Sequence, residues 1–356
     1  MSSPFEASLT CLQGWCAGHS PTTEDYQQLA SEILADSEQA QAFGITSFNV
    51  LEEVKWRSQI FSDIYPQVWQ LCQEMGFPDQ NQVIRTLWIL WLPLTLQLVA
   101  ERQKLERPIV QGILGGQGSG KTTLTAVIRL ILEHLNYTSV GFSLDDLYKS
   151  YVQRQQLQQQ DPRLIWRGPP GTHDVEIGVE LLDGLRQPKR RKPVIVPRFD
   201  KSAWGGAGDK ATPEMIDPVD IVLFEGWFVG VRPIDPREFD QAPPPIITPE
   251  DRHFAWDMND RLMEYVPLWH RLDRLMILYP VDYRFSKQWR REAEHKMKAQ
   301  GKGGMSDEEL EQFVEYFWRS LHPDLFIRPL IHNSILTDLV VEINEDHTVG
   351  RIYQPT

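Results

Sequence analysis

The spacing of apolar residues divides the chain near residue 107. Before this point, apolar residues recur every three or four positions, which is the period of an amphipathic helix. Thr22 to Asp25 form a helix-start signal, and Asp79 to Arg107 predict a long helix kinked at Pro93. We therefore predict a helical N-terminal region over residues 1–106. The apolar positions that share a helix face are Tyr26, Leu29, Ile33 and Leu34 in one segment and Val54, Ile60, Ile64, Val68 and Leu71 in the next.

Beyond residue 107, short β-prone runs alternate with helical segments. Such alternation is typical of parallel strands joined by crossover helices. We therefore predict an α/β fold over residues 107–356, with a mostly parallel sheet flanked by helices. The proline-rich stretch 232–249 predicts an extended loop or insertion. The β-prone runs are Ile109–Leu114, Thr138–Leu144, Pro193–Arg198, Asp220–Phe224, Arg274–Tyr279 and Asp338–Ile343.

The first β-prone run leads into a glycine-rich loop with the pattern G-x-x-x-x-G-K-T. Strand, loop and helix follow in the order of a phosphate-binding P-loop, in which backbone N–H groups and the helix start converge on an anion. We expect Lys121 to reach the β- and γ-phosphates of ATP and Thr122 to offer its hydroxyl to Mg²⁺. The alternative is a glycine-rich turn without a ligand. The residues expected to bind nucleotide are Gly115, Gly116, Gln117, Gly118, Ser119, Gly120, Lys121, Thr122 and Thr123.

Carboxylates follow two other runs, at the edge where open α/β sheets bind ligands. Asp145 and Asp146 come after the second run. Beside a P-loop, one can accept the proton of an attacking hydroxyl, and the other can orient the substrate or a metal-bound water. Glu225 ends the run Asp220–Phe224, which is the Walker B arrangement that holds Mg²⁺. The alternative for these carboxylates is a helix cap.

Two loops combine basic, polar and glycine residues. One spans Arg167–Asp174 and includes His173. The other, Pro197–Gly206, continues a β-prone run, so we expect Arg198 and Lys201 at the ligand edge of the sheet. Arginine suits a carboxylate ligand because its planar fork pairs with both oxygens. The alternative is a pair of surface loops with solvated charges.

A possible lid spans about residues 284–305. A helix starts near Ser286, the glycine-rich segment 300–304 has the composition of a hinge, and a capped helix begins near Ser306. Closure of such a lid would bring Arg290 or Arg291 toward the γ-phosphate and exclude water. The alternative is a purely structural helical hairpin.

Composition narrows the class of protein. The chain has 356 residues, 41% of them hydrophobic, and a net charge of −13. This acidity argues against a nucleic-acid partner, although basic residues can still gather around an anionic ligand. The apolar stretch Thr86–Ala100 is shorter than a membrane span and predicts a buried helix. Three cysteines and no visible targeting peptide favour the reducing cytoplasm.

The motifs together resemble the D-glycerate 3-kinases of plants and cyanobacteria, which are relatives of uridine kinase, pantothenate kinase and phosphoribulokinase. The resemblance covers about Ile109 to Leu321. One segment departs from it: Gly206–Lys210 replaces a family G-R-G-D-R. The matching motifs are G-Q-G-S-G-K-T-T at Gly116–Thr123, S-L-D-D-L-Y at Ser143–Tyr148, R-G-P-P-G-T-H-D at Arg167–Asp174, P-R-F-D-K-S-A-W-G-G at Pro197–Gly206, V-L-F-E-G-W at Val222–Trp227 and G-M-S-D-E-E at Gly304–Glu309.

The resemblance implies a kinase that uses ATP and Mg²⁺ to convert D-glycerate to 3-phosphoglycerate. It implies Asp145 and Lys121 as catalytic residues, Thr122 and Glu225 as metal residues, and Arg290 as a nucleotide-binding lid arginine. Two alternatives remain open: another small-metabolite kinase acting on uridine, pantothenate or a sugar phosphate, and a nucleotide-switched regulatory ATPase. We expect no nucleic-acid or membrane partner, and a monomer is favoured. The residues expected to bind the acceptor substrate are Asp146, Tyr148, Arg167, His173, Arg198 and Lys201.

Overall fold

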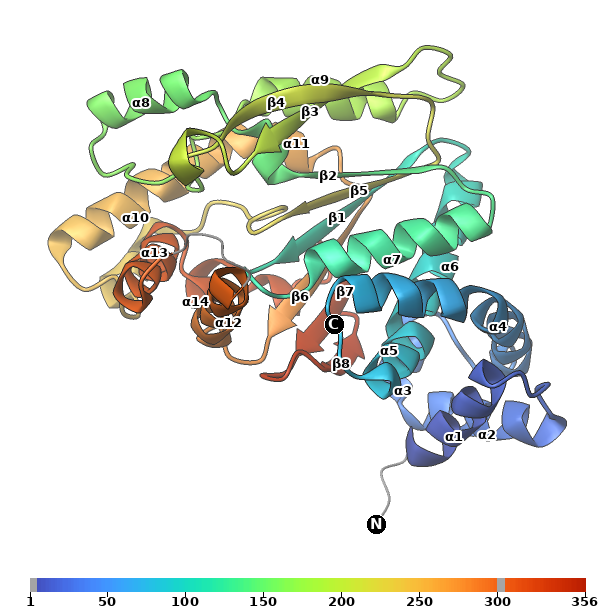
Figure 1. The fold of residues 1–356 in the computed structure, drawn as a ribbon. Coiled ribbons are helices and arrows are strands. Elements are labelled where there is room, and N and C mark those ends of the chain that lie inside the picture. The colour runs from blue at the N-terminus through green and yellow to red at the C-terminus, as the bar shows by residue number, and fades with distance from the viewer. Residues whose placement is uncertain (1–4, 300–304) are drawn as a thin grey trace.

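A six-stranded sheet forms the centre of the computed structural model, which describes residues 5–299 and 305–356 (Figure 1). Its strand order is β2-β5-β1-β6-β7-β8. All neighbouring strands are parallel except β8, which is antiparallel to β7. The predicted α/β fold with a mostly parallel sheet is confirmed. The strands are β1 Ile109–Gly115, β2 Ser139–Ser143, β5 Ile221–Gly226, β6 Arg274–Pro280, β7 Leu339–Ile343 and β8 Val349–Tyr353.

Both faces of this sheet are covered, which explains why its central strands β1, β5 and β6 are mostly apolar and buried. Every residue of β1 is buried. Ile109 and Ile113 belong to the hydrophobic core on one face, whereas Val110 and Leu114 belong to the core on the other. This alternation follows from the two-residue period of a strand. The helices that follow β1 are α7 Lys121–His134, α8 Tyr151–Gln160, α9 Val175–Leu185, α10 Pro249–Arg261, α11 Val266–Trp269, α12 Phe285–Ala299, α13 Asp307–Ser320 and α14 Pro323–Phe326.

One β-prone run does not join the parallel sheet. Residues 194–200 form β3 (Val194–Asp200), which pairs antiparallel with β4 (Asp209–Ile216) in a separate two-stranded sheet. The prediction that this run is a parallel strand was wrong. Only Val196 is buried within β3, so the strand lacks the apolar faces that a covered parallel sheet requires. The hairpin lies beyond the β2 edge of the main sheet (Figure 1).

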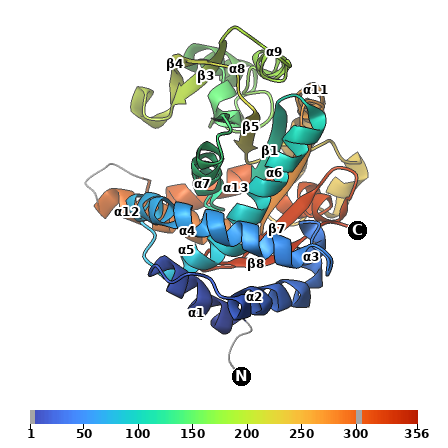
Figure 2. The same cartoon turned by 90° about the vertical axis from the view of Figure 1, so that its right-hand side faces the viewer.

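The N-terminal region is helical, as predicted, and packs against α7. Thr22 and Asp25 form the expected capping box at the start of α2. Figure 2 shows α4 and α6 alongside α7, and these helices share one hydrophobic core with a face of the sheet. The division of the chain into 1–106 and 107–356 stays a prediction. The helices are α1 Phe5–Cys16, α2 Thr23–Ala35, α3 Ser37–Ala42, α4 Val50–Glu74, α5 Gln80–Thr86 and α6 Leu92–Leu105, with the π-helical turn η1 Leu87–Trp91 between α5 and α6.

The apolar helix that runs from Gln80 to Leu105 is a core helix. It is long and apolar enough to cross a membrane, but 78% of its most apolar window is buried inside the protein. The irregular part of this helix is the π-helical turn η1, which lies one turn before Pro93. The kink had been predicted at Pro93 itself. Pro93 has no N–H to donate to the carbonyl of Ile89. The Gln39 side chain donates to that carbonyl instead, at 2.7 Å.

Short helical turns complete the connections around the sheet. The proline-rich stretch 232–249 is irregular except for one 3-10 turn, and α10 begins at its last proline, Pro249. Prolines at the first positions of helices fit there because those N–H groups have no partner within the helix. The remaining turns are η2 Leu144–Leu147, η3 Trp204–Gly206, η4 Pro236–Gln241, η5 Leu262–Tyr265 and η6 Leu330–His332.

Candidate active site

The glycine-rich loop joins β1 to α7 in the geometry of a phosphate cradle. Gly118 and Gly120 have φ of 79° and 88°, a left-handed backbone that glycine adopts without strain. The Lys121 ammonium lies over the loop and donates to the carbonyls of Gly115 and Gly116, at 2.7 and 2.8 Å. Burial lowers the pKa of Lys121, and nearby carboxylates oppose that shift. The loop therefore concentrates N–H donors and one buried cation at the start of a helix.

Thr122 and Glu225 lie opposite each other beside this loop. The Thr122 hydroxyl is 3.5 Å from Oε1 of Glu225. The other oxygen, Oε2, is buried and has no hydrogen-bond partner within residues 5–299 and 305–356. Burial raises the pKa of Glu225, while Lys121 opposes the shift. A hydroxyl beside an unsatisfied carboxylate oxygen suits Mg²⁺, which uses one or two protein oxygens and completes its shell with water and phosphate.

Asp145 faces the same site from the turn that follows β2. Its carboxylate is 2.6 Å from the ammonium of Lys201, and the nearby Tyr148 hydroxyl also favours its ionised form. Burial opposes ionisation of Asp145, but Lys201 outweighs this effect and holds the pKa of the carboxyl below its usual value. The Asp145 charge also acts on Lys121 and Glu225. The structure thus brings Asp145, Lys201 and the P-loop together.

Unlike Asp145, Asp146 makes hydrogen bonds that hold the local structure together. Its carboxylate accepts hydrogen bonds from the backbone N–H groups of Ser143 and Phe199, at 2.9 and 3.2 Å, and from Arg198 at 3.2 Å. The first bond belongs to a capping box around η2. Burial raises the pKa of Asp146, and these donors oppose the shift. The helix-cap alternative therefore describes Asp146, whereas Asp145 points at a cation.

Arg198 ties the β3–β4 hairpin to the end of β2. Besides Asp146, its guanidinium donates to the carbonyl of Gly141 at 3.1 Å and to the Glu214 carboxylate at 2.7 Å. Both terminal nitrogens thus have acceptors within the protein. This placement favours a role in positioning Lys201, which follows three residues later, over direct contact with a ligand.

His173 is buried beneath Tyr148. Its ring stacks on Tyr148 with centroids 4.5 Å apart, and Nδ1 is 2.8 Å from the hydroxyl of Tyr265. Burial lowers the pKa of His173 to about 3, so the ring is neutral. Its Nε2 is buried with no hydrogen-bond partner in the described part of the chain. Sequence reasoning missed Tyr265, which lies 92 residues away and carries no motif.

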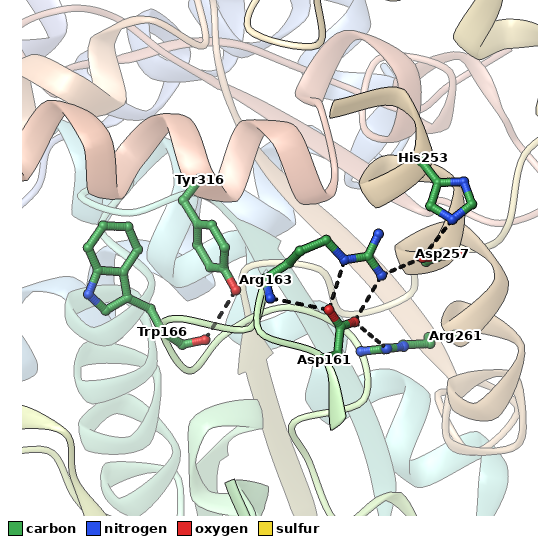
Figure 3. A network of polar contacts seen from close by, with 7 residues as sticks. All are labelled: Asp161, Arg163, Trp166, His253, Asp257, Arg261 and Tyr316. Carbon is green, nitrogen blue, oxygen red and sulfur yellow. Dashed lines mark hydrogen bonds and ion pairs between the residues drawn. The ribbon is translucent and has the colours of Figure 1, made fainter. Parts of the chain in front are cut away.

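Arg167 and the loop that carries it are fixed by contacts to two helices. Arg167 donates to the carbonyl of Gly206 at 2.6 Å and lies over the ring of Phe199. Figure 3 shows how the preceding segment is held. The network joins Asp161 to Arg163 and Arg261, Arg163 to Asp257, and the Tyr316 hydroxyl to the Trp166 carbonyl. Sequence reasoning missed this network because its charges come from the loop and from α10, about a hundred residues apart, and α13 adds only the Tyr316 hydroxyl.

The first helix of the predicted lid, α12, lies against the P-loop. A side chain at Gly118 would come within 2.7 Å of Cβ of Trp289. Arg290 pairs with the buried Glu294 at 3.0 Å and lies over the ring of Phe313. No contact joins Arg290 to the P-loop in the parts of the chain that the structure describes. The predicted hinge residues Gly301, Gly303 and Gly304 lie outside the described residues, so the lid stays a prediction.

These features define a class of protein. A P-loop cradle, a threonine–glutamate pair beside it and an ionised aspartate facing the same space are the parts of a P-loop kinase that phosphorylates a small molecule. No family model matches the chain. Individual relatives do match it, and they identify the family.

The chain is 32% identical over 242 residues to the uncharacterized kinase mug58 of Schizosaccharomyces pombe, covering 62% of this chain and 83% of that one. It is 30% identical over 251 residues to the chloroplastic D-glycerate 3-kinase of Arabidopsis thaliana, covering 67% of this chain and 53% of that one. The solved structure of D-glycerate 3-kinase from Cryptococcus neoformans matches with a TM-score of 0.65 and 28% identity, covering 73% of this chain and 96% of that one. The chain belongs to the family of kinases that includes D-glycerate 3-kinase. The predicted resemblance and kinase class are confirmed.

Proposed function

We propose that this protein transfers the γ-phosphoryl group of ATP to D-glycerate, giving ADP and 3-phosphoglycerate. The observation that carries the proposal is the Asp145–Lys201 pair, 2.6 Å apart, facing the P-loop. A base and a cation side by side suit an acceptor that has both a hydroxyl and a carboxylate. The relatives from Arabidopsis and Cryptococcus, which are named D-glycerate 3-kinases, support the choice of substrate.

On the nucleotide side, the loop from Gly116 to Thr123 would surround the phosphates with N–H donors. Lys121 would exchange the carbonyls of Gly115 and Gly116 for phosphate oxygens, because an ammonium binds a charged oxygen more strongly than a carbonyl. Thr122 and Glu225 would hold Mg²⁺, which when bound neutralises charge on the phosphate oxygens. Their hydroxyl and unsatisfied carboxylate oxygen fit that ion.

On the acceptor side, Asp145 would take the proton of the glycerate hydroxyl as its oxygen attacks the γ-phosphorus. Lys201 keeps Asp145 ionised and offers a positive charge to the substrate carboxylate. Arg167 is a second cation for that carboxylate. His173 would act indirectly, because its neutral ring is buried and stacks beneath Tyr148. Tyr148 holds Asp145 from the other side.

The cellular setting is part of the same proposal. Cys11, Cys16 and Cys72 are free thiols, and burial raises the pKa of Cys16 to about 12, which leaves it unreactive. Free, protonated thiols fit the reducing cytoplasm. We further infer that the protein acts as a monomer without a nucleic-acid or membrane partner.

The direct test is to measure ADP release with and without D-glycerate and to identify the product by NMR. We expect ADP release to depend on D-glycerate and the product to carry phosphate on the oxygen of C3. Uridine, pantothenate and sugar phosphates serve as competing acceptors. Faster turnover with one of these acceptors would mean that this acceptor, and not glycerate, is the substrate. ADP release that no small acceptor accelerates would point to a regulatory ATPase.

The positioning role of Arg198 gives a second testable result. We expect Arg198→Lys to raise the KM for the acceptor about tenfold, because one ammonium cannot reproduce the fork that joins Asp146, Gly141 and Glu214. The KM for ATP should stay within about twofold, since no contact links Arg198 to the P-loop within the described residues. Steady-state kinetics with each substrate varied in turn would measure both.

Arg190→Lys is the matched control. Arg190 also bonds to the backbone near the β3–β4 hairpin, at its other end, through the carbonyls of Ile216 and Asp217. The Arg190→Lys variant should leave the KM values for the acceptor and for ATP unchanged. If both variants raised the acceptor KM equally, the effect would come from hairpin stability and not from placement of Lys201.

A further inference from the structure

A second cavity lies among the N-terminal helices, away from the candidate active site. Residues of helices α1 to α5, of the turn η1 and of strand β8 line it, and its volume is about 540 Å³. Cavities of roughly 300–1,000 Å³ are the size that holds small-molecule ligands. Its wall has an apolar part and a polar part. The polar side chains include Ser8, Glu32, Gln39, Arg57 and Arg85, and Trp88 is the largest apolar one.

Arg57 is the unusual member of this wall. Its side chain is only 4% exposed, and its ion pair with Glu53, at 3.8 Å, is too long to be a hydrogen bond. Nε of Arg57 is buried without a partner, and no hydrogen bond joins this guanidinium to another residue that the structure describes. Burial lowers the pKa of Arg57 to about 10. A buried charge is costly unless a counter-ion or hydrogen bonds compensate it.

The acidic residues of the wall do not supply that compensation. Glu38 is paired with Arg351 at 2.9 Å, and Asp36 caps α3 by accepting from the N–H of Gln39 at 3.0 Å. Glu32 accepts a bond from the Ser8 hydroxyl, and burial raises the pKa of Glu32 to about 7, with Arg85 opposing the shift. Glu32 is therefore partly neutral near pH 7. Among the described residues, the Arg57 guanidinium therefore has one carboxylate partner, Glu53 at 3.8 Å, and its Nε has no hydrogen bond.

We propose that this cavity is an effector site for a small anionic metabolite, whose carboxylate or phosphate group pairs with Arg57. A guanidinium binds such groups through two parallel hydrogen bonds. In its protonated form Glu32 can add a donor to the same anion. The ligand's carbon skeleton would lie against Trp88 and the apolar side of the cavity.

The position of the cavity explains how an occupant would affect the kinase site. Trp88 belongs to the π-helical turn η1, and the next residues of that turn, Leu90 and Trp91, line a hollow shared with Gly120 and Thr123 of the P-loop. A bound anion would thus touch one side of a turn whose other side meets the start of α7. Single π-helical turns are frequent at functional sites.

The test uses the whole protein with Mg²⁺ and a saturating non-hydrolysable ATP analogue, so that the P-loop is occupied. Inorganic phosphate and malonate are titrated separately by calorimetry. We expect at least one of them to bind with a Kd below about 1 mM, and whichever binds identifies the ligand as a phosphate or a carboxylate. Arg57→Gln should weaken this binding at least tenfold, and Arg57→Lys should weaken it less. Arg102→Gln, which removes a half-buried arginine of α6, is the matched control.

A second variant covers the case in which Arg57→Gln does not fold. Ala35 lies exposed at the end of α2 and lines the cavity, so Ala35→Trp should fill the cavity without disturbing the core. Neither variant should change kcat in the absence of added anion. The Kd of the ATP analogue should shift at least twofold when the anion is present, and this shift should vanish in both variants. If neither anion binds, if both variants leave binding unchanged, or if the nucleotide Kd does not respond, the proposal is overturned.

Discussion

Replacing Lys121 with alanine is expected to lower kcat at least about a hundredfold, the usual cost of losing a preorganised contact to developing charge. The Lys121 ammonium is buried in the P-loop and is held over it by the carbonyls of Gly115 and Gly116. These neutral acceptors fix its position without neutralising its charge. The charge is therefore available to the transferring phosphoryl group with little reorganisation. Single-turnover measurements with saturating ATP would isolate the chemical step.

The fold should survive this substitution because the two bonds that Lys121 makes are local to the loop. The melting temperature and the circular dichroism spectrum check that point. Lys104→Ala is the matched control, since Lys104 is an exposed lysine paired with Glu101 at 2.7 Å on α6. It should leave kcat unchanged. Near-normal turnover in folded Lys121→Ala protein would show that the glycine-rich loop is not part of the active site.

The parts of the fold that could be predicted are those governed by local pattern. A strand covered on both faces is expected to be mostly apolar, and β1 is buried at every position and apolar except at Gln111. The P-loop was recognisable because its tight backbone needs glycine at Gly118 and Gly120. Asp145 could be found because a carboxylate that follows a parallel strand lies at the edge where ligands bind. In each case the physical requirement acts on residues close together in the chain.

The features that were missed depend on residues distant in sequence. The run Pro193–Arg198 was assigned to the main sheet because a short β-prone run does not reveal its partner, and the partner strand β4 was not predicted. Tyr265 supports His173 across 92 residues, and nothing near either residue marks the pair. Arg57 lies in the amphipathic pattern of α4 like any polar residue. Its shortage of partners, a 3.8 Å ion pair with Glu53 and an Nε without a hydrogen bond, is visible only once α2, α3 and α5 surround it.

Mutation should distinguish the roles of the two adjacent aspartates, Asp145 and Asp146. We expect Asp145→Asn to lower the single-turnover rate by roughly 10²–10⁴, the usual contribution of a positioned base. Asparagine keeps the shape of the side chain but cannot take the proton of the acceptor hydroxyl. Burial opposes ionisation of Asp145, but Lys201 outweighs this effect and holds the pKa of the carboxyl below its ordinary value of 3.8. Because the ionised form is the active one, the wild-type rate should lose nothing to Asp145 as the pH falls from 8 to about 5.

Asp146→Asn should act on stability and acceptor binding more than on chemistry. Asp146 accepts from Ser143, Phe199 and Arg198, so the variant loses charge-assisted bonds worth about 1–3 kcal/mol of unfolding free energy. Asp146→Asn should weaken the contact between the turn after β2 and the hairpin that carries Lys201, and this should raise the acceptor KM. The two variants differ by one position in one turn, so each controls for the other. If Asp146→Asn caused the larger fall in the single-turnover rate, the proton would pass to Asp146, and the capping bonds seen here would have to break during each turnover.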